Sequence, residues 1–300
     1  MLYMDNVNRI IFWWVIPFIF IMYFTFRLFE GDVTFDQGRS DILEQHALNL
    51  RHNNEINCLI LGGSNSFFSL SAHIMSTKDE LNCYNLSLLN EGFSDKAYLD
   101  FIRDSSLKKT DIKYVFYSTV YPFSDKDFSE RLKDNERGIS IIGKSGFSLV
   151  GNSIASYLYE WNRYYQNNLI HYPIPTKTGD FDFSKYICKY PEDKKDSNLL
   201  DVNSSIINWI NGNISSMKNN FFNAKIYLVL PSTLRIKKTD QNFSDFSNLL
   251  KQQINDSSIF LVEQSGFKDD SVLCDNINHA NEVGREIRTK ELINLISETL

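Results

Sequence analysis

Three polar residues of this 300-residue chain, Ser64, His279 and Asp275, have the types and the positions that nucleophilic catalysis needs. Ser64 stands in the segment LGGSNS (61–66), directly after a short apolar run, and His279 stands in CDNINHANEVG (274–284) near the carboxyl terminus. A histidine can take the proton of a serine hydroxyl, and an acid such as Asp275 can orient the imidazole ring. These residues predict acyl transfer through a covalent serine intermediate. Ser66 is the fallback nucleophile, but it falls two residues into the expected helix.

The surroundings of Ser64 favour this chemistry without requiring it. A serine between a strand and a helix lies near free backbone N–H groups and partial positive charge, which can stabilise an oxyanion. The alternative is an ordinary strand-to-helix turn in which Ser64 caps the helix. A phosphate-binding loop is a further alternative, but neither Gly-x-Gly-x-x-Gly nor the Lys-Ser/Thr ending is present. For His279, the alternative is a surface loop before a helix that Asn281 caps.

Five short apolar segments are expected to form the strands that position these residues. They are residues 56–61, 83–87, 114–118, 225–230 and 259–262, and the chain closes with a helix from about residue 281 to 296. Continuously apolar strands that alternate with helices predict a parallel sheet covered on both faces, with functional sites at the carboxyl ends of the strands. The expected fold is therefore α/β, a three-layer αβα sandwich of flavodoxin-like type around a mainly parallel five-stranded sheet.

The remaining segments are expected to precede or interrupt this domain. Residues 1–30 are expected to be a membrane anchor, residues 31–55 a polar linker with a short helix, and residues 56–300 the α/β domain. A helical insertion is expected at about residues 123–223, with helical stripes at 154–165 and 206–210 and a loop-like stretch at 171–186. The insertion either forms a lid over the site or packs extra helices on the sheet edge, and the second interpretation is favoured.

The anchor is predicted from the uncharged apolar run of residues 10–26. As a helix it would be about 25 Å long, near the lower limit for a single transmembrane helix. A cleaved signal peptide and a buried core helix are the alternatives, but no small-residue cleavage site follows and the run has no polar face. Charge around the run slightly favours a cytoplasmic amino end, with the catalytic domain periplasmic or extracellular.

Composition narrows the expected partners. The net charge is −6 and the basic residues form no dense block, so a nucleic-acid partner is not expected. Cys58 and Cys83 fall in predicted buried strands and are interpreted as small apolar residues. Cys188 and Cys274 could form a disulfide in an oxidising compartment. No metal or cofactor is expected, and four histidines without metal-ligand spacing are interpreted as surface or structural residues: His46, His52, His73 and His171.

Three motifs, in this order, resemble those of the SGNH (GDSL-like) hydrolase family: GGSNS (62–66), NLS (85–87) and His279-x-Asn281-x-x-Gly284. The closest resemblance is to the membrane-anchored branch associated with modification of bacterial envelope polysaccharides. It implies a serine-dependent esterase or O-acyltransferase that acts on acyl, commonly acetyl, groups of a glycan, with a membrane-bound acyl donor as a further partner. It also implies Ser64 as nucleophile and as one oxyanion donor through its N–H, and His279 as base. The second oxyanion donor is expected near Asn90 or Gly92.

The chain departs from the family pattern in three places. Gly63 replaces the usual acid, the stretch STVYP (118–122) lacks the asparagine expected after the third strand, and Asn276 occupies the usual aspartate position three residues before the histidine. Asp275 can orient His279 only if the loop between them bulges. A non-catalytic module that binds a glycan or an assembly partner therefore stays an alternative to the enzyme, and a nucleotide-using transferase is a third hypothesis.

Overall fold

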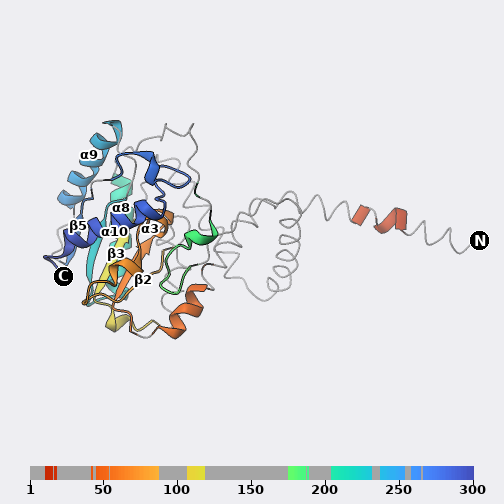
Figure 1. Ribbon diagram of the computed structural model, residues 1–300, viewed down its shortest axis with the longest axis horizontal. Helices are drawn as coiled ribbons and strands as arrows, with labels where there is room; N and C mark the ends of the chain where they lie inside the picture. Colours follow the sequence, from red (N-terminus) through yellow and green to blue (C-terminus); the bar gives the residue numbers. More distant parts are fainter. Residues whose placement is uncertain are drawn as a thin grey trace, which may run out of the picture. The chain divides into compact units, whose positions relative to one another are not determined.

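The computed structural model shows a five-stranded sheet with helices on both faces (Figure 1). Contacts group the chain into two units, Met1–Ser40 with Leu149–Leu169, and Asp41–Ser148 with Ile170–Leu300, and the second unit contains the sheet. The structure describes residues 11–15, 17–18, 42, 45–53, 55–87, 107–118, 175–186, 188, 204–231, 237–253, 258–264 and 266–300.

The sheet has the strand order β2-β1-β3-β4-β5, and every neighbouring pair is parallel. This order is the flavodoxin-like one, so the predicted parallel α/β sheet is confirmed. Residues 56–57, 86–87 and 230, which were expected in strands, lie outside them. The strands are β1 (Cys58–Gly62), β2 (Cys83–Asn85), β3 (Tyr114–Ser118), β4 (Lys225–Val229) and β5 (Ile259–Val262).

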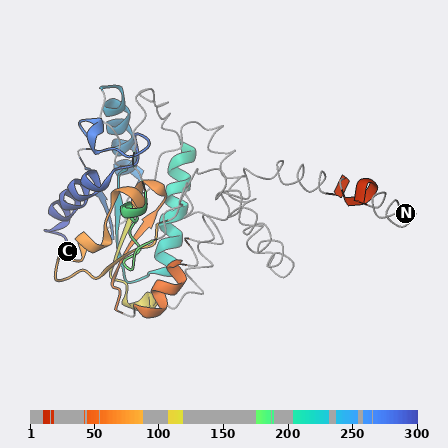
Figure 2. The same ribbon diagram turned by 45° about the vertical axis from the view of Figure 1, so that its right-hand side comes forward.

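Each face of the sheet packs against its own apolar cluster. Successive strand side chains point to opposite faces, so Leu59 joins one cluster and Ile60 the other. The first cluster receives side chains from α8 (Ser204–Asn220), from α9 (Lys237–Gln253) and from the helical residues 45–52. The second cluster receives them from α4 (Ala72–Met75) and α10 (Glu282–Ile296), and Figure 2 shows α8 and α10 on opposite sides of the strands. These layers make up an αβα sandwich.

The helices agree only in part with the sequence expectations. The predicted helix around residues 206–210 is confirmed as α8, and the closing helix is confirmed as α10. Helix α9 was not expected; it buries Phe246 and Leu250 against the sheet. The helical stripe at 154–165 lies outside the described residues.

Little of the predicted anchor is described. Residues Ile11–Val15 form a short π-helical segment, η1. Within the described ranges there is no helix with the length and apolar character needed to cross a membrane. Most of residues 10–26 lie outside those ranges.

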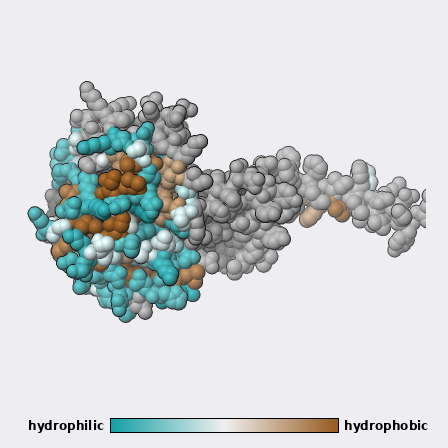
Figure 3. Space-filling model, viewed as in Figure 1, coloured by the Kyte–Doolittle hydropathy of each residue, from teal (hydrophilic) through white to brown (hydrophobic). Residues whose placement is uncertain are grey.

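Helix α10 packs one side against the sheet and leaves apolar residues exposed on the other. It buries Leu292 and Ile296 in the second cluster, while Val283 and Ile287 are exposed on its other side. In the view of Figure 3, apolar residues appear among hydrophilic ones on the face of the domain where α10 lies. Its first turn follows directly on the loop that carries His279, so the packing of α10 fixes one end of that loop.

All four cysteines are paired, in the disulfides Cys58–Cys83 and Cys188–Cys274. The second pairing was anticipated as an option. The interpretation of Cys58 and Cys83 as separate buried apolar residues was wrong. They are register partners on the adjacent parallel strands β1 and β2, and their Cα atoms are 4.3 Å apart. Since register partners point to the same face, their sulfur atoms meet within the second cluster.

The Cys58–Cys83 disulfide should contribute measurably to stability. It closes a loop with a sequence separation of 25 residues. Loss of that constraint on the unfolded chain should lower the free energy of unfolding by about 3 kcal/mol in the variant C58A/C83A. Urea unfolding of the wild type and the variant measures the difference, and thiol titration of the unfolded, unreduced wild type should find no free thiol. Free thiols in that sample, or an unchanged unfolding midpoint in the variant, would contradict this expectation.

Candidate active site

Ser64 lies at the carboxyl end of β1, as the first residue of α3 (Ser64–Ser69). Gly63 occupies the N-cap position, so Ser64 does not cap the helix. Its hydroxyl is instead 2.9 Å from Nε2 of His279. Gly62 has a φ of +144°, and a Cβ at this position would lie 1.8 Å from the carbonyl oxygen of Ser118. A side chain at residue 62 would thus separate β1 from β3 immediately before the serine.

His279 and Asp275 come from one loop between η5 (Asp270–Val272) and α10. An isolated bridge between Leu273 and Ala280 and a hydrogen bond from the N–H of Cys274 to the carbonyl of His279 close the loop. This closure brings Oδ1 of Asp275 to 2.7 Å from Nδ1 of His279, although the two residues are four positions apart. Asp275 therefore contacts the histidine despite the departure from the family spacing.

The contacts of the imidazole fit a general base. When Nδ1–H donates to Asp275, the lone pair of Nε2 faces the hydroxyl of Ser64. The side-chain Nδ2 of Asn276 is also 2.8 Å from Nδ1 of His279, and Oδ1 of Asn276 accepts from the N–H of Asn278. An N–H cannot donate to a protonated nitrogen, so in the base tautomer Asn276 is a neighbour of Nδ1 and Asp275 is its acceptor.

Burial and hydrogen bonding have opposite effects on the pKa of Asp275. Partial burial disfavours its charged form, but hydrogen bonds from His279 and Tyr186, with the nearby His279 charge, lower the pKa of Asp275 below its usual value overall. The imidazole itself is shielded from water, with 13% of its side chain exposed. It stacks on the ring of Phe68 with centroids 4.2 Å apart and planes 5° apart. Asp275 is thus held ionised beside an oriented imidazole.

A buried arginine joins the carboxyl ends of the strands beneath the site. Arg288 of α10 is only 2% exposed. Its Nε donates to Gln264 and its Nη1 to Oδ1 of Asn65, at 2.7 and 3.0 Å. Its Nη2 donates to Oγ of Ser118 and to the carbonyl of Leu230, at 3.1 and 2.8 Å. One guanidinium therefore links residues at the ends of β1, β3, β4 and β5.

Asn65 connects Arg288 to the loop that carries His279. It follows Ser64 directly, is fully buried, and donates from Nδ2 to the carbonyl of Asn278 at 2.5 Å. Since Asn278 precedes His279, this bond ties the nucleophile turn to the base loop. Arg288 orients the same carboxamide through Oδ1, so it contributes to the Ser64–His279 geometry through Asn65.

Replacement of Arg288 by methionine should destabilise the domain strongly. The variant R288M leaves several buried acceptors without their donor, so the free energy of unfolding should fall by about 2–4 kcal/mol. Urea unfolding measures the loss. The matched control is K290M in the same helix, which removes an exposed ion pair with Glu286 and should leave the stability nearly unchanged. Equal losses in the two variants would show that the Arg288 hydrogen bonds contribute little.

The other predicted site residues have structural contacts or lie outside the described residues. Ser66 is buried and donates to the carbonyl of Gly63 at 2.8 Å, so its hydroxyl is not presented to a substrate. Asn90 and Gly92, the expected oxyanion donors, lie outside the described residues. Of the predicted donors, only Ser64 is described; as the first residue of α3, its N–H has no intrahelical acceptor.

The remaining motif residues shape the fold around the site. Asn281 is the N-cap of α10 and accepts from the N–H of Gly284, as the alternative interpretation of this segment expected. A Cβ on Gly284 would lie 2.3 Å from the carbonyl oxygen of Val272, so this position requires glycine for space. Asn85 of the NLS motif is buried and donates to the carbonyl of Leu70.

The structure describes three of the other four histidines. His46 is fully buried, contacts the hydroxyl of Tyr84, and has a pKa lowered to about 4 by burial. His52 and His73 are exposed, and His171 lies outside the described residues. In the part of the chain that the structure describes, no three His, Cys, Asp or Glu side chains are grouped as metal ligands.

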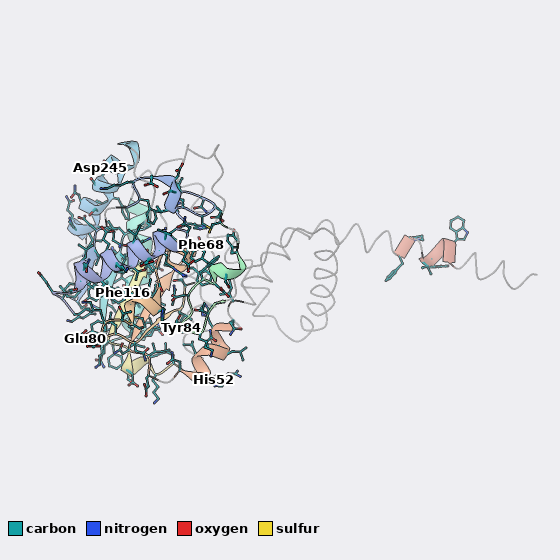
Figure 4. The ribbon with its side chains drawn as sticks, viewed as in Figure 1. His52, Phe68, Glu80, Tyr84, Phe116 and Asp245 are labelled. Carbon is teal, nitrogen blue, oxygen red and sulfur yellow. A yellow bond between two sulfur atoms is a disulfide. The ribbon has the colours of Figure 1, made fainter. Side chains whose placement is uncertain are left out.

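Four site residues were missed by sequence reasoning: Asn65, Phe68, Tyr186 and Arg288. Figure 4 labels Phe68 near the segment that carries η4 (Phe183–Lys185), and the rings of Phe68 and Phe183 are 6.3 Å apart. Asn65 lies within GGSNS and could have been suspected from that position. Tyr186 and Arg288 stand in segments whose sequence pattern does not indicate the site.

Comparison with known proteins gives only distant similarities. No family model and no curated protein sequence matches the chain. Among solved structures, it is similar to a family two carbohydrate esterase from Clostridium thermocellum in complex with cellohexaose, with 12% identity and a TM-score of 0.41. It is also similar to an active-site mutant of a family two carbohydrate esterase from the same organism, with 11% identity and a TM-score of 0.42.

A third similar structure is an acetyl xylan esterase from the rumen bacterium Butyrivibrio proteoclasticus, with 7% identity and a TM-score of 0.40. Each match covers 82% of this chain but only 64–65% of the other chain. The chain thus spans less than two thirds of the length of these proteins.

Proposed function

We propose that this protein is a serine-dependent ester hydrolase or O-acyltransferase that acts on acyl groups, in the first instance acetyl groups, of a polysaccharide. The observation that carries the proposal is the continuous contact from Asp275 through His279 to Ser64, with distances of 2.7 and 2.9 Å. These are the contacts by which a carboxylate orients a histidine and a histidine activates a serine. The position of Ser64 between a parallel strand and a helix adds its backbone N–H as an oxyanion donor.

In the first half-reaction, Oγ of Ser64 attacks the carbonyl carbon of the ester. Its proton passes to Nε2 of His279 as the new C–O bond forms, and the negative charge moves to the carbonyl oxygen. When the tetrahedral intermediate collapses, the bond to the alcohol oxygen breaks and His279 returns the proton to that oxygen. Ionised Asp275 stabilises the imidazolium that exists between these two proton transfers.

In the second half-reaction, His279 takes a proton from the acceptor, whose oxygen attacks the acyl carbon of acyl-Ser64. The bond to Oγ then breaks, and the proton returns to Ser64. Water as the acceptor makes the protein an esterase, whereas a sugar hydroxyl makes it an O-acyltransferase. The same three residues serve both reactions.

The proposed setting is the bacterial envelope. The resemblance of GGSNS, NLS and the His279 motif to SGNH proteins supports an envelope polysaccharide as substrate and a membrane-bound acyl donor as partner. The two disulfides support an oxidising compartment, because disulfides are rare in reducing cytosol. We accordingly propose that residues 10–26 anchor the chain and that the α/β domain is periplasmic or extracellular.

Acyl turnover by the full-length chain tests this proposal. The donors are p-nitrophenyl acetate and a partially O-acetylated polysaccharide, each with and without an unacetylated oligosaccharide as acceptor. Released acetate identifies a hydrolase, and acetylated oligosaccharide identifies a transferase. The absence of both products from a well-folded protein would contradict the proposal and favour a non-catalytic glycan-binding module.

A further inference from the structure

A segment of the long insertion reaches the proposed catalytic acid. The hydroxyl of Tyr186 donates to Oδ2 of Asp275 at 3.1 Å, while Oδ1 of the same carboxylate contacts His279. Both oxygens of Asp275 are thereby held. We propose that Tyr186 is a positioning residue that fixes the Asp275 carboxylate for His279, and that the Cys188–Cys274 disulfide keeps Tyr186 in place. The inference rests on the proposed function and adds the insertion to the active site.

Asp275 needs a second contact because of its place in the loop. It lies four residues before His279, and its side chain is 36% exposed. With one hydrogen bond to the imidazole, a partly exposed carboxylate can rotate away from the ring. A second donor on Oδ2 removes that freedom. Burial and the neighbouring Asp275 raise the pKa of Tyr186 to about 12, so its hydroxyl stays protonated and remains a donor at every pH suitable for an assay.

The disulfide brackets the contact between the tyrosine and the aspartate. Cys274 immediately precedes Asp275, and Cys188 follows Tyr186 by two residues. The disulfide therefore joins the two chain segments close to the hydrogen bond between Tyr186 and Asp275. Since its bonded residues are 86 positions apart in sequence, the disulfide holds together segments that would otherwise meet only through tertiary packing.

The other end of the segment is anchored by Asp180. Its buried carboxylate accepts from the N–H groups of Ala72 and His73 and from the hydroxyl of Ser71, at 2.6, 3.0 and 2.9 Å. Between Asp180 and the disulfide, an aromatic ring of the segment packs against the site. Phe181 packs against Phe68, the ring on which the imidazole stacks, with centroids 4.1 Å apart.

Arg285 of α10 secures the middle of the segment. It donates to the carbonyl of Phe181 at 2.7 Å and lies 4.5 Å from the centre of the Phe183 ring. The described part of this segment, residues 180–186 and 188, is therefore attached to α4, to α10 and to the catalytic loop. This attachment makes the segment suited to fix a side chain rather than to open and close over the site.

The variant Y186F tests the inference with a minimal change of shape. With p-nitrophenyl acetate and the full-length chain, kcat should fall by about 10- to 100-fold with little change in KM. Losses of this size are typical when a residue that orients a metal-binding side chain is replaced, and Tyr186 orients Asp275 in a comparable way. The acid limb of the kcat/KM profile should also move to higher pH. The Tyr186 hydrogen bond lowers the pKa of Asp275, so its loss makes the Asp275 carboxylate easier to protonate.

A matched control is Y227F, which removes a hydroxyl bonded to Thr299 at the far end of the sheet and should leave kcat and the pH profile unchanged. The variant C188A/C274A should lose activity comparably, and adding Y186F to it should have little further effect. The variant C58A/C83A, with the remote disulfide removed, should keep its kcat.

Two outcomes would overturn the inference, and they can be distinguished. If the wild type turns over ester through Ser64 and Y186F matches Y227F in both kcat and acid limb, Tyr186 does not position Asp275 and the proposed function stands. If the wild type shows no turnover that depends on Ser64, the proposed function falls and the inference falls with it.

Discussion

Replacement of Ser64 by alanine should abolish ester turnover. Removal of a serine nucleophile from such a site typically costs about 10⁴-fold or more in kcat, because the covalent pathway is lost and only binding and oxyanion stabilisation remain. His279→Ala should have an effect of similar size, since its Nε2 is the one basic group placed at 2.9 Å from the serine hydroxyl in the described part of the chain. Steady-state rates with p-nitrophenyl acetate measure both effects.

Two controls separate a specific loss from general damage. Ser66→Ala should retain activity within about 10-fold, because the hydroxyl of Ser66 is buried against the carbonyl of Gly63. His73→Ala changes an exposed histidine and should retain full activity. If S64A were as active as the wild type while S66A were inactive, the nucleophile would be Ser66 and the geometry proposed for Ser64 would be wrong.

Asp275→Asn should produce the second large effect. Asparagine can present an N–H to Nδ1, which favours the tautomer that protonates Nε2 and removes the base. Loss of the orienting carboxylate in sites of this kind costs about 10²- to 10⁴-fold in kcat. A value of kcat within about threefold of the wild type would indicate that Ser64 and His279 act without the acid.

A second substitution sharpens this test. The side-chain amide of Asn276 lies 2.8 Å from Nδ1 of His279, so a carboxylate at residue 276 has a position from which it can orient the ring. The double variant D275N/N276D should therefore recover part of the activity that D275N loses. Recovery would indicate that the spacing between acid and histidine is flexible in this loop, and a double variant as inactive as D275N would show that Asp275 is needed at its own position.

The difference in stability between the wild type and the D275N variant should also depend on pH. The pKa of Asp275 in the folded protein is below its ordinary value, so the ionised carboxylate stabilises the fold. This contribution is complete above about pH 4, the ordinary value for aspartate, and is lost as the pH falls through the lower folded-state value. The difference in unfolding free energy between wild type and D275N should therefore shrink below about pH 4.

Much of the fold was predictable because the strands are short, apolar and bounded by polar residues. Residues 114–118 and 259–262 coincide with β3 and β5, and the parallel arrangement follows from the alternation of strands with helices. The same reasoning placed Ser64 and His279 at one edge of the sheet, where the structure brings them together. That edge was predictable because all parallel strands end on the same side.

Helix α9 was missed although its buried residues recur at helical spacing. Phe246 and Leu250 are four positions apart and face the core, but the polar residues around them obscured the pattern. The Cys58–Cys83 disulfide was missed for a different reason. Its formation depends on β1 and β2 being neighbours in register, and sequence indicates strands more readily than their pairing.

The residues that orient the site were the hardest to predict. Tyr186 reaches Asp275 from a segment expected to be a loop, and Arg288 reaches Asn65 from the buried side of α10. Each contact joins residues far apart in sequence, so no local pattern marks it. An arginine in an amphipathic helix ordinarily indicates an exposed face, whereas Arg288 is buried by the acceptors that surround it.

The most direct test of the central claim is covalent labelling of the full-length chain with a fluorophosphonate. An activated serine attacks phosphorus, fluoride leaves, and the hydroxyl proton passes to the base. Intact mass should show one adduct, peptide mapping should place it on Ser64, and it should be absent from S64A and strongly reduced in H279A and D275N. A folded wild-type protein without an adduct, or with the adduct on another serine, would contradict the assignment of Ser64 as a nucleophile activated by His279.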